Sequence, residues 1–167
     1  MERILVIGSP GAGKSTLARK LSLVLNLPLY HIDNLYYNGD GEHVSREELI
    51  LRLDPILRSE RWIIDGNYSA TFRHRLAFAT AVILLDIDTE VCIAGINERV
   101  GVKRSDFPFV EAEAPRELIA SAERYRSYTL PKMLAAIKEQ PRVKLLRFTT
   151  REEANNYLHK LKKGKTV

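Results

Sequence analysis

Apolar residues gather along the chain in short continuous runs, without the alternation of apolar and polar positions that half-exposed strands show. The runs lie at residues 3–8, 27–32, 61–65, 81–87 and 142–148. A strand that is covered on both faces needs apolar side chains at successive positions, so these runs predict buried strands of a parallel sheet.

Helical patterns occupy the intervals between these runs. Leucines follow the first run at helical spacing, and Ser45 with Glu48 and Thr150 with Glu153 form capping-box patterns ahead of further leucine repeats. Pro115 suits the first position of a helix. Strand and helix therefore alternate, which predicts an α/β fold with helices on both faces of a five-stranded parallel sheet. Ligands of such sheets bind outside the carboxyl ends of the strands.

The segment GSPGAGKST directly follows the first predicted strand and satisfies the P-loop pattern G-x-x-x-x-G-K-S/T. Glycines let backbone N–H groups curl around phosphate oxygens, and the next helix presents its positive N-terminus there. Lys14 reaches the β and γ phosphates, and Ser15 ligates magnesium. We therefore predict that ATP and Mg²⁺ bind here, on Gly8, Ser9, Pro10, Gly11, Ala12, Gly13, Lys14, Ser15 and Thr16.

Aspartates end several of the predicted strands. Asp33, Asp65 and either Asp86 or Asp88 fall at carboxyl ends, on the edge of the sheet that carries the P-loop. Magnesium prefers oxygen ligands and retains several waters, which such carboxylates orient, so Ser15 and Asp65 form the predicted metal site. The alternative is that aspartates only terminate strands, since they favour turns. The segment DIDT at 86–89 is also typical of a helix N-cap.

Composition and charge narrow the class of protein. The 167 residues, 45% of them hydrophobic, suit one domain spanning 1–167. No uncharged stretch is long enough to cross a bilayer and the first apolar run is too short for a secretory signal, so we expect a cytoplasmic protein with no membrane partner. The single cysteine, Cys92, excludes an internal disulfide. A net charge of +5 favours anionic partners, and small phosphorylated ligands are anionic partners of this kind.

Beyond the P-loop, further segments carry a resemblance that covers nearly the whole chain. They are HIDNLYY, WIIDGNYS, VILLDID followed by ERVGVKR, and LLRFTTREEANNYL. With them the chain resembles the adenylate-kinase-like P-loop kinases, and among these the bacterial DNA topology modulation proteins, because adenylate kinases carry DGFPR in place of DGNY. The resemblance implies a P-loop NTPase three-layer α/β/α fold, with a substrate-binding helical segment at about 34–60 and a short basic lid at about 99–126.

The resemblance also implies roles for single residues. Asp65 matches the aspartate that orients magnesium waters, and Arg99 lies near the start of a lid whose arginines close on the phosphates. Arg104 is a further lid arginine, and RYRSY resembles a shikimate-kinase-like pattern that assigns Arg124 to the acceptor. The segment 147–150 follows the last strand, where the family contacts adenine. The predicted catalytic residues are Lys14, Arg99, Asp33, Arg104 and Arg124.

The acceptor side departs from the adenylate kinase pattern. Tyr36 stands where those enzymes grip a monophosphate with arginine, and DGNYS lacks the arginine of DGFPR. Gly95 stands where they place an arginine that packs on the donor adenine. Aromatic residues near Asp33 stack a ring, bind hydroxyls or simply pack. His31 is interpreted as a packed or surface histidine rather than a base. The predicted substrate-binding residues are Asp33, Tyr36, Asp65, Asn67, Arg73 and Arg75.

The leading hypothesis is a magnesium-dependent kinase that moves the γ-phosphate of ATP to a small molecule, either a nucleotide-like phosphate or a hydroxyl compound. A hydroxyl acceptor benefits from a general base such as Asp33, whereas a phosphate acceptor is already ionised. Two alternatives stay open: an ATP-dependent regulator that binds DNA, and an NTPase whose acceptor is water. The charge permits nucleic acid, yet no helix-turn-helix, zinc module or aromatic platform supports it. The acceptor, the preference for ATP over GTP, the oligomeric state and the catalytic lid arginine stay open as well.

Overall fold

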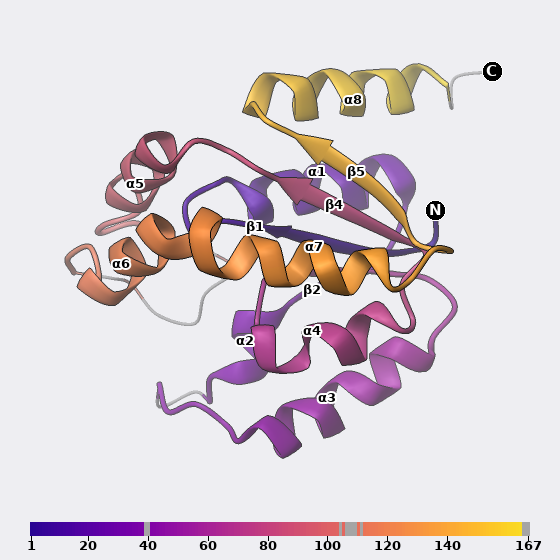
Figure 1. Ribbon diagram of the computed structural model, residues 1–167, viewed down its shortest axis with the longest axis horizontal. Coiled ribbons are helices and arrows are strands. Elements are labelled where there is room, and N and C mark those ends of the chain that lie inside the picture. The colour runs from indigo at the N-terminus through magenta and orange to yellow at the C-terminus, as the bar shows by residue number, and fades with distance from the viewer. Residues whose placement is uncertain (39–40, 104, 106–109, 111, 165–167) are drawn as a thin grey trace.

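The fold is built on a parallel β-sheet (Figure 1). The computed structural model describes residues 1–38, 41–103, 105, 110 and 112–164. The described residues form a sheet of five strands in the order β2-β3-β1-β4-β5, with all neighbours parallel. The strands are β1 (Arg3–Gly8), β2 (Leu29–His31), β3 (Trp62–Asp65), β4 (Ala81–Leu85) and β5 (Lys144–Phe148). The predicted five-stranded parallel sheet is confirmed.

Helices connect the strands. They are α1 (Lys14–Leu25), α2 (Ile32–Tyr36), α3 (Arg46–Arg58), α4 (Ser69–Leu76), α5 (Thr89–Asn97), α6 (Arg116–Arg124), α7 (Leu130–Lys138) and α8 (Arg151–Lys163), with a π-helical turn η1 (Tyr125–Thr129) between α6 and α7. Ser45 accepts from the Glu48 N–H at 3.1 Å, and Thr150 with Glu153 makes a full capping box. Pro115 lies at the N-cap of α6, one position before the predicted one.

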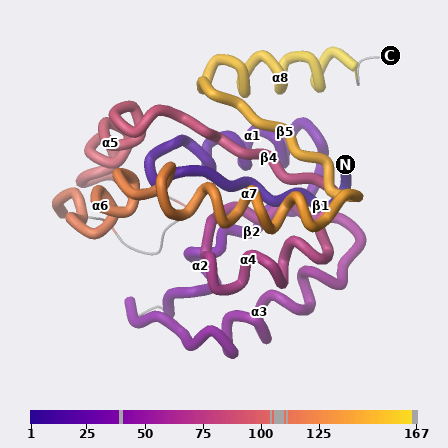
Figure 2. Tube along the Cα trace, viewed as in Figure 1, coloured from indigo at the N-terminus to yellow at the C-terminus, as the bar shows by residue number. Residues whose placement is uncertain are grey.

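The helices cover both faces of the sheet (Figure 1, Figure 2). Successive residues of β1 point to opposite faces, so Leu5 and Ile7 join one core while Ile4 and Val6 join the other. The first core packs against α3, α4 and α7, and the second against α1, α5 and α8. Burial on both faces explains why the apolar runs are continuous in the central strands.

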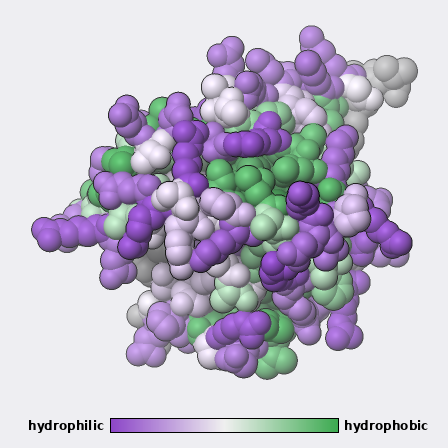
Figure 3. Space-filling view, in the orientation of Figure 1, coloured by the Kyte–Doolittle hydropathy of each residue, from purple (hydrophilic) through white to green (hydrophobic). Residues whose placement is uncertain are grey.

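Strand β5 forms an edge of the sheet and is less covered than the central strands. Its residues are exposed or half-buried, and Leu145 is 37% exposed. Figure 3 shows apolar side chains gathered over this strand, between α7 and α8. Among the described residues, no helix combines the length and apolarity needed to cross a bilayer.

The strand register brings candidate site residues to the end of the sheet where the carboxyl ends of the strands lie. Val6 of β1 and His31 of β2 both pair with Asp65, the last residue of β3. Strand β1 runs two residues beyond Val6 to Gly8, where the P-loop begins. The parallel topology therefore places the loop beside Asp65, as ligand sites of such sheets require.

Candidate active site

Residues 8–16 form a tight loop between β1 and α1. The Ala12 N–H donates to the Ser9 carbonyl at 3.1 Å, and Gly13 precedes α1 with a φ of 96°. Gly11, with a φ of 80°, packs so closely that a Cβ there would lie 1.9 Å from the Cys92 carbonyl oxygen. The loop therefore needs glycine both for its left-handed backbone and for its contact with α5. Its position before the N-terminus of α1 suits it to bind phosphate.

Lys14 lies between this loop and the acidic strand ends. Its Nζ donates to the Ser9 carbonyl at 3.0 Å. Burial lowers the pKa of Lys14, Asp65 and Asp33 oppose that shift, and Arg99 adds to it. The two carboxylates and the guanidinium are thus within electrostatic reach of the ammonium group. The structure brings these four predicted site residues together.

Asp65 is held by a histidine on the neighbouring strand. His31 Nδ1 lies 2.8 Å from Asp65 Oδ2, and since a carboxylate only accepts hydrogen bonds, the ring nitrogen donates. The His31 side chain is 11% exposed and that of Asp65 is 4% exposed. His31 is thus nearly buried and, in addition, holds the Asp65 carboxylate, a contact that the sequence pattern did not indicate. The signal that points to the pair is the register of β2 on β3, which sets the two residues opposite each other.

The second oxygen of the same carboxylate fits a metal site. Asp65 Oδ1 is buried and has no hydrogen-bond partner among the described residues. Such an oxygen is costly to bury unless a ligand completes its bonding. The described residues contain no group of three or more His, Cys, Asp or Glu side chains that could hold a metal. The Asp65 carboxylate and the Ser15 hydroxyl offer the oxygen donors that magnesium prefers, and magnesium keeps several waters, so these two residues suit it.

The segment after β3 braces the P-loop. Asn67 Nδ2 donates to the Gly8 carbonyl at 2.7 Å, and Asn67 Oδ1 accepts from the Gly8 N–H at 3.1 Å. Arg75 is fully buried and donates to the backbone carbonyls of residues 66–68. Burial lowers the pKa of Arg75 to about 9, so the guanidinium stays charged at neutral pH. This placement corrects the prediction that Arg75 binds the acceptor, because the side chain is fully buried and its two terminal nitrogens bond to the backbone. Acceptor binding by Asn67 stays a prediction.

Arg73 lies away from the phosphate loop. Its guanidinium makes two contacts with the Glu139 carboxylate, one of them at 3.1 Å. Glu139 follows α7, and the chain then enters β5 at Lys144, which pairs with Ala81, the first residue of β4. Arg73 and Glu139 therefore lie toward the end of the sheet where the strands begin, opposite the P-loop. The prediction that Arg73 binds the acceptor is therefore corrected as well.

Helix α2, which follows β2, carries Asp33 and Tyr36. The Tyr36 ring stacks on His43 with centroids 5.2 Å apart, and its centroid lies 4.2 Å from that of Tyr68 and 5.1 Å from that of Tyr37. We call Tyr36, Tyr37, His43 and Tyr68 the tyrosine cluster. Burial raises the pKa of Tyr68, and Asp33 raises it further. Asp33 is therefore within electrostatic reach of both Lys14 and Tyr68.

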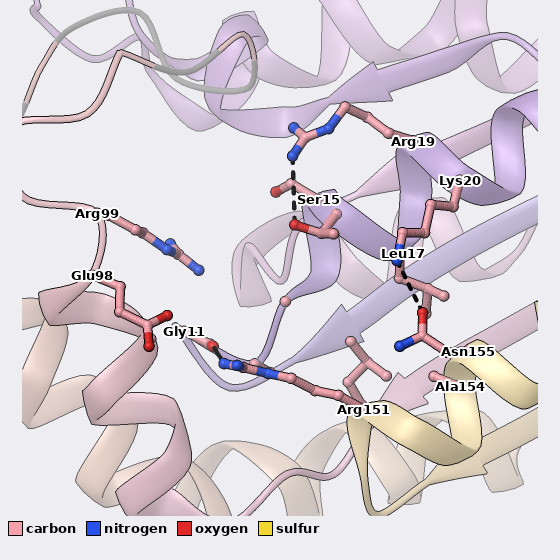
Figure 4. Close-up of a pocket in the computed structure, with 15 residues that line it drawn as sticks. Gly11, Ser15, Leu17, Arg19, Lys20, Glu98, Arg99, Arg151, Ala154 and Asn155 are labelled. Atoms are coloured by element: carbon pink, nitrogen blue, oxygen red, sulfur yellow. Dashed lines mark hydrogen bonds between the residues drawn. The ribbon is translucent and has the colours of Figure 1, made fainter.

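The predicted lid is partly described. Arg104 lies outside the described residues. Arg99 follows α5 and lines the cavity beside Glu98 (Figure 4). Arg124 ends α6 on the exposed surface, within electrostatic reach of Tyr128. The roles of these arginines in catalysis stay predictions.

Asp86 is paired with two arginines, and the sequence pattern did not indicate this pairing. Arg126 of η1 donates to Asp86 Oδ1 at 3.2 Å and to the Asp86 carbonyl at 3.1 Å, and it pairs with Asp88 at 2.9 Å. Arg147 Nε donates to Asp86 Oδ2 at 3.0 Å. Both carboxylate oxygens of Asp86 thus accept hydrogen bonds from arginine, whereas Asp65 keeps one oxygen without a partner among the described residues. Arg147 belongs to the segment 147–150 that we expect to contact adenine, and its guanidinium binds Asp86.

A cavity of about 300 Å³ lies beside the P-loop (Figure 4). Its walls come from the loop, from α1, from the end of α5 and from the start of α8. Lys20 Nζ donates to Asn155 Oδ1 at 3.0 Å and joins α1 to α8. The cavity adjoins Ser15 and Arg99, so it has the position that a donor nucleotide needs.

Arg151 at the start of α8 is a cavity residue that the sequence pattern did not indicate. Its Nη2 donates to the Gly11 carbonyl at 2.9 Å. A Cβ at position 95 would lie 2.6 Å from Arg151 Nη2 and 2.5 Å from the Gly11 carbonyl oxygen. Gly95 therefore leaves room for an arginine that arrives from another helix. No local pattern ties these positions together, because α5 and α8 meet only in the folded chain.

The comparisons with known proteins support this architecture. No protein-family profile and no curated protein matches the chain. Among solved structures, "Shikimate kinase from Acinetobacter baumannii in complex with shikimate" aligns at a TM-score of 0.60 and 16% identity, over 100% of this chain and 96% of that one. The chain has the fold of a shikimate kinase. The predicted P-loop three-layer α/β/α fold is thereby confirmed, and at this identity the likeness concerns the fold alone.

Proposed function

We propose that the protein is a magnesium-dependent kinase that transfers the γ-phosphate of ATP to a small molecule. The observation that carries the proposal is the grouping of Lys14 with two carboxylates and Arg99 beside the P-loop. A nucleotide-gated switch or motor needs the same phosphate loop, so the loop by itself does not indicate transfer. Transfer also needs a group that faces the acceptor and cations that stabilise the phosphoryl group in flight, and Asp33 and Arg99 suit these tasks.

The donor side holds the triphosphate through backbone N–H groups of the loop and through Lys14. The Lys14 ammonium exchanges the Ser9 carbonyl for phosphate oxygens, which are stronger acceptors because they are charged. Ser15 and Asp65 would hold magnesium, and His31 keeps the Asp65 carboxylate in one orientation. Bound magnesium neutralises charge on the β- and γ-phosphate oxygens.

Transfer to a hydroxyl acceptor needs a proton acceptor on the opposite side. Asp33 takes the hydroxyl proton while the acceptor oxygen bonds to the γ-phosphorus and the bond to the bridging β–γ oxygen breaks, so that ADP leaves. Arg99 stabilises the charge on the transferring oxygens. This sequence of steps conserves atoms and charge.

The DNA-binding alternative rests on the resemblance to DNA topology modulation proteins. Contacts with DNA phosphates make affinity fall steeply with salt. Titration of duplex DNA at low and high salt tests that alternative, and undetectable affinity at low salt would reject it.

Acceptor-dependent ADP formation with ATP, Mg²⁺ and a panel of metabolites tests the kinase proposal. Lys14→Ala is expected to abolish turnover. Arg99→Ala is expected to lower kcat by about a hundredfold while the Kd for ATP changes by less than about threefold, because the arginine acts on the transition state. Lys138→Ala, at the exposed end of α7, is the matched control for loss of a cation. Unchanged turnover in both site variants would reject the proposal.

A further inference from the structure

The first turns of α8 are anchored to the helix that follows the P-loop. A capping box fixes the start of α8, as described above. Ala154 is 3% exposed and joins the core beside α1, and Lys20 of α1 donates to Asn155 at 3.0 Å. Arg151, the first residue of α8, therefore extends from a fixed point of the backbone.

The Arg151 guanidinium lies against the P-loop. Its Nη2 donates to the Gly11 carbonyl at 2.9 Å, close to the space that a Cβ at position 95 would take. Its Nε lies beside Gly13, since a Cβ there would be 3.7 Å away, at ordinary contact distance. In Figure 4 the side chain runs from the start of α8 along the wall of the cavity to Gly11. The bond to the loop backbone thus fixes the guanidinium at one wall of the cavity.

The guanidinium of Arg151 is nevertheless accessible to a ligand. Arg151 is an exposed residue, although one of its nitrogens is bonded to the loop. Within the described part of the chain, no carboxylate forms an ion pair with it. A guanidinium has five N–H donors in its plane and two flat faces, and a bond to one carbonyl uses one donor and neither face. Arg151 therefore keeps its charge and its planar surface available to the cavity.

The cavity wall has few groups that can recognise a planar base. None of its described residues is aromatic, and those that carry a guanidinium are Arg19, Arg99 and Arg151. Arg19 Nη2 lies 3.5 Å from the Thr16 hydroxyl of the loop, and Arg99 is the arginine that we assign to the transferring phosphate. Because the loop and Ser15 hold the phosphates in the proposed kinase, the nucleoside has to occupy the remaining cavity, between the end of α5 and the start of α8. Arg151 lines that part.

We propose that Arg151 is a specificity-determining residue of the donor site, where its guanidinium stacks on the planar base of the nucleotide. The proposal rests on the proposed kinase function, because it assigns a residue to the base end of the same donor. A delocalised guanidinium is attracted to the face of a π-system, and the attraction is stronger where water is excluded. Arg151 therefore distinguishes a triphosphate that carries a base from one that does not.

Matched ligands with and without a base test the proposal by binding alone. Calorimetric titration in the presence of Mg²⁺ compares two probes: the ATP analogue with an imido bridge between its β and γ phosphates, and ribose 5-triphosphate, which has no base. In Arg151→Ala the Kd for the ATP analogue is expected to rise about tenfold, while the Kd for ribose 5-triphosphate changes by less than about threefold. An unchanged Kd for the ATP analogue overturns the proposal. Equal losses for both probes overturn it as well, because they assign Arg151 to the phosphates or to the shape of the loop.

Further variants separate the planar group from its charge. Arg151→Lys keeps the positive charge and loses the plane, so it is expected to raise the Kd for the ATP analogue at least about fivefold. Arg142→Ala, at an exposed arginine of the turn before β5, is the control for loss of a cation, and it is expected to bind both probes as the wild type does. Wild-type affinity for the ATP analogue in Arg151→Lys contradicts planar stacking.

The role of Arg151 and the kinase function fail in different ways. The kinase function fails if no acceptor receives phosphate from ATP, even where both probes bind. The role of Arg151 fails if the wild type binds ribose 5-triphosphate as tightly as the ATP analogue, which calorimetry detects whether or not transfer occurs. A wild-type protein that binds neither probe rejects both.

Discussion

His31 of β2 donates through Nδ1 to Asp65 Oδ2 of β3 over 2.8 Å, and the other Asp65 oxygen is buried without a hydrogen-bond partner among the described residues. One strand thus supplies the carboxylate and its neighbour sets the orientation. In the proposed kinase the histidine would act on the reaction through Asp65, so we expect it to be a positioning residue.

Removal of this histidine should lower catalysis more than nucleotide binding. His31→Ala is expected to reduce kcat by about ten- to a hundredfold, the usual effect of losing a partner of a metal-facing ligand, while the Kd for ATP changes little. His31→Gln, whose amide can donate to the carboxylate, should restore part of kcat. Steady-state kinetics with ATP titration measures both quantities. A His31→Ala variant with the kcat of the wild type contradicts the role.

Two arginines two positions apart on α4 should differ sharply in their effect on stability. Arg75→Ala removes a donor from three backbone carbonyls, of which the Tyr68 carbonyl keeps the Thr71 N–H, and it is expected to lower the free energy of unfolding by about 3 kcal/mol. Arg73→Ala removes an exposed ion pair with Glu139 and is expected to leave the unfolding midpoint unchanged. Urea denaturation compares the two. Similar midpoints for both variants would show that Arg75 does not support the loop after β3.

A methyl group at position 95 should disturb the P-loop. Alanine normally stabilises a helix relative to glycine, yet in Gly95→Ala the Cβ would lie 2.5 Å from the Gly11 carbonyl oxygen. We expect a net loss of about 1–3 kcal/mol in unfolding free energy and weaker ATP binding. Gly164→Ala is the control, because the nearest atom to its Cβ would be 3.6 Å away.

The double variant Gly95→Ala/Arg151→Ala sharpens this test. It should not recover ATP binding, since the backbone contact with Gly11 remains after the flexible side chain is removed. Full recovery would show that Arg151, rather than the loop backbone, limits the size of residue 95.

Arg126 and Arg124, two positions apart, should have separable effects. Arg126→Ala removes one of the two arginines from Asp86, which is only 4% exposed, and is expected to lower the free energy of unfolding by about 1–2 kcal/mol. Arg124→Ala should leave stability unchanged and raise the KM for the acceptor if the shikimate-kinase-like pattern in RYRSY holds. Denaturation and acceptor kinetics on both variants decide the point. A stability loss in Arg124→Ala with none in Arg126→Ala would reverse the assignment.

Local patterns predict most of the fold and the core of the site. Continuous apolar runs mark the strands, Thr150 with Glu153 marks the start of α8, and the P-loop pattern marks the loop between β1 and α1. Parallel topology then places Asp65 beside the loop without further information. These features depend on neighbours in the sequence, or on a rule that holds for parallel sheets as a class.

The remaining site residues depend on contacts between distant parts of the chain. Arg75 carries the charge expected of a ligand-binding arginine, yet the direction of α4 turns it into the protein, where it bonds to residues 66–68. Arg151 reaches Gly11 across 140 positions of sequence, in space that Gly95 leaves open. A residue type predicts a charge, but only packing decides what that charge faces.

The destination of the γ-phosphate tests the central claim most directly. ATP labelled at the γ-phosphate is incubated with the protein, Mg²⁺ and a mixture of nucleosides, sugars and their phosphates, and the label is followed by chromatography. The account predicts label in an organic phosphate ester with the wild-type protein, and none with Lys14→Ala or after chelation of Mg²⁺. Label found only in inorganic phosphate, at the same rate with and without the mixture, would contradict it.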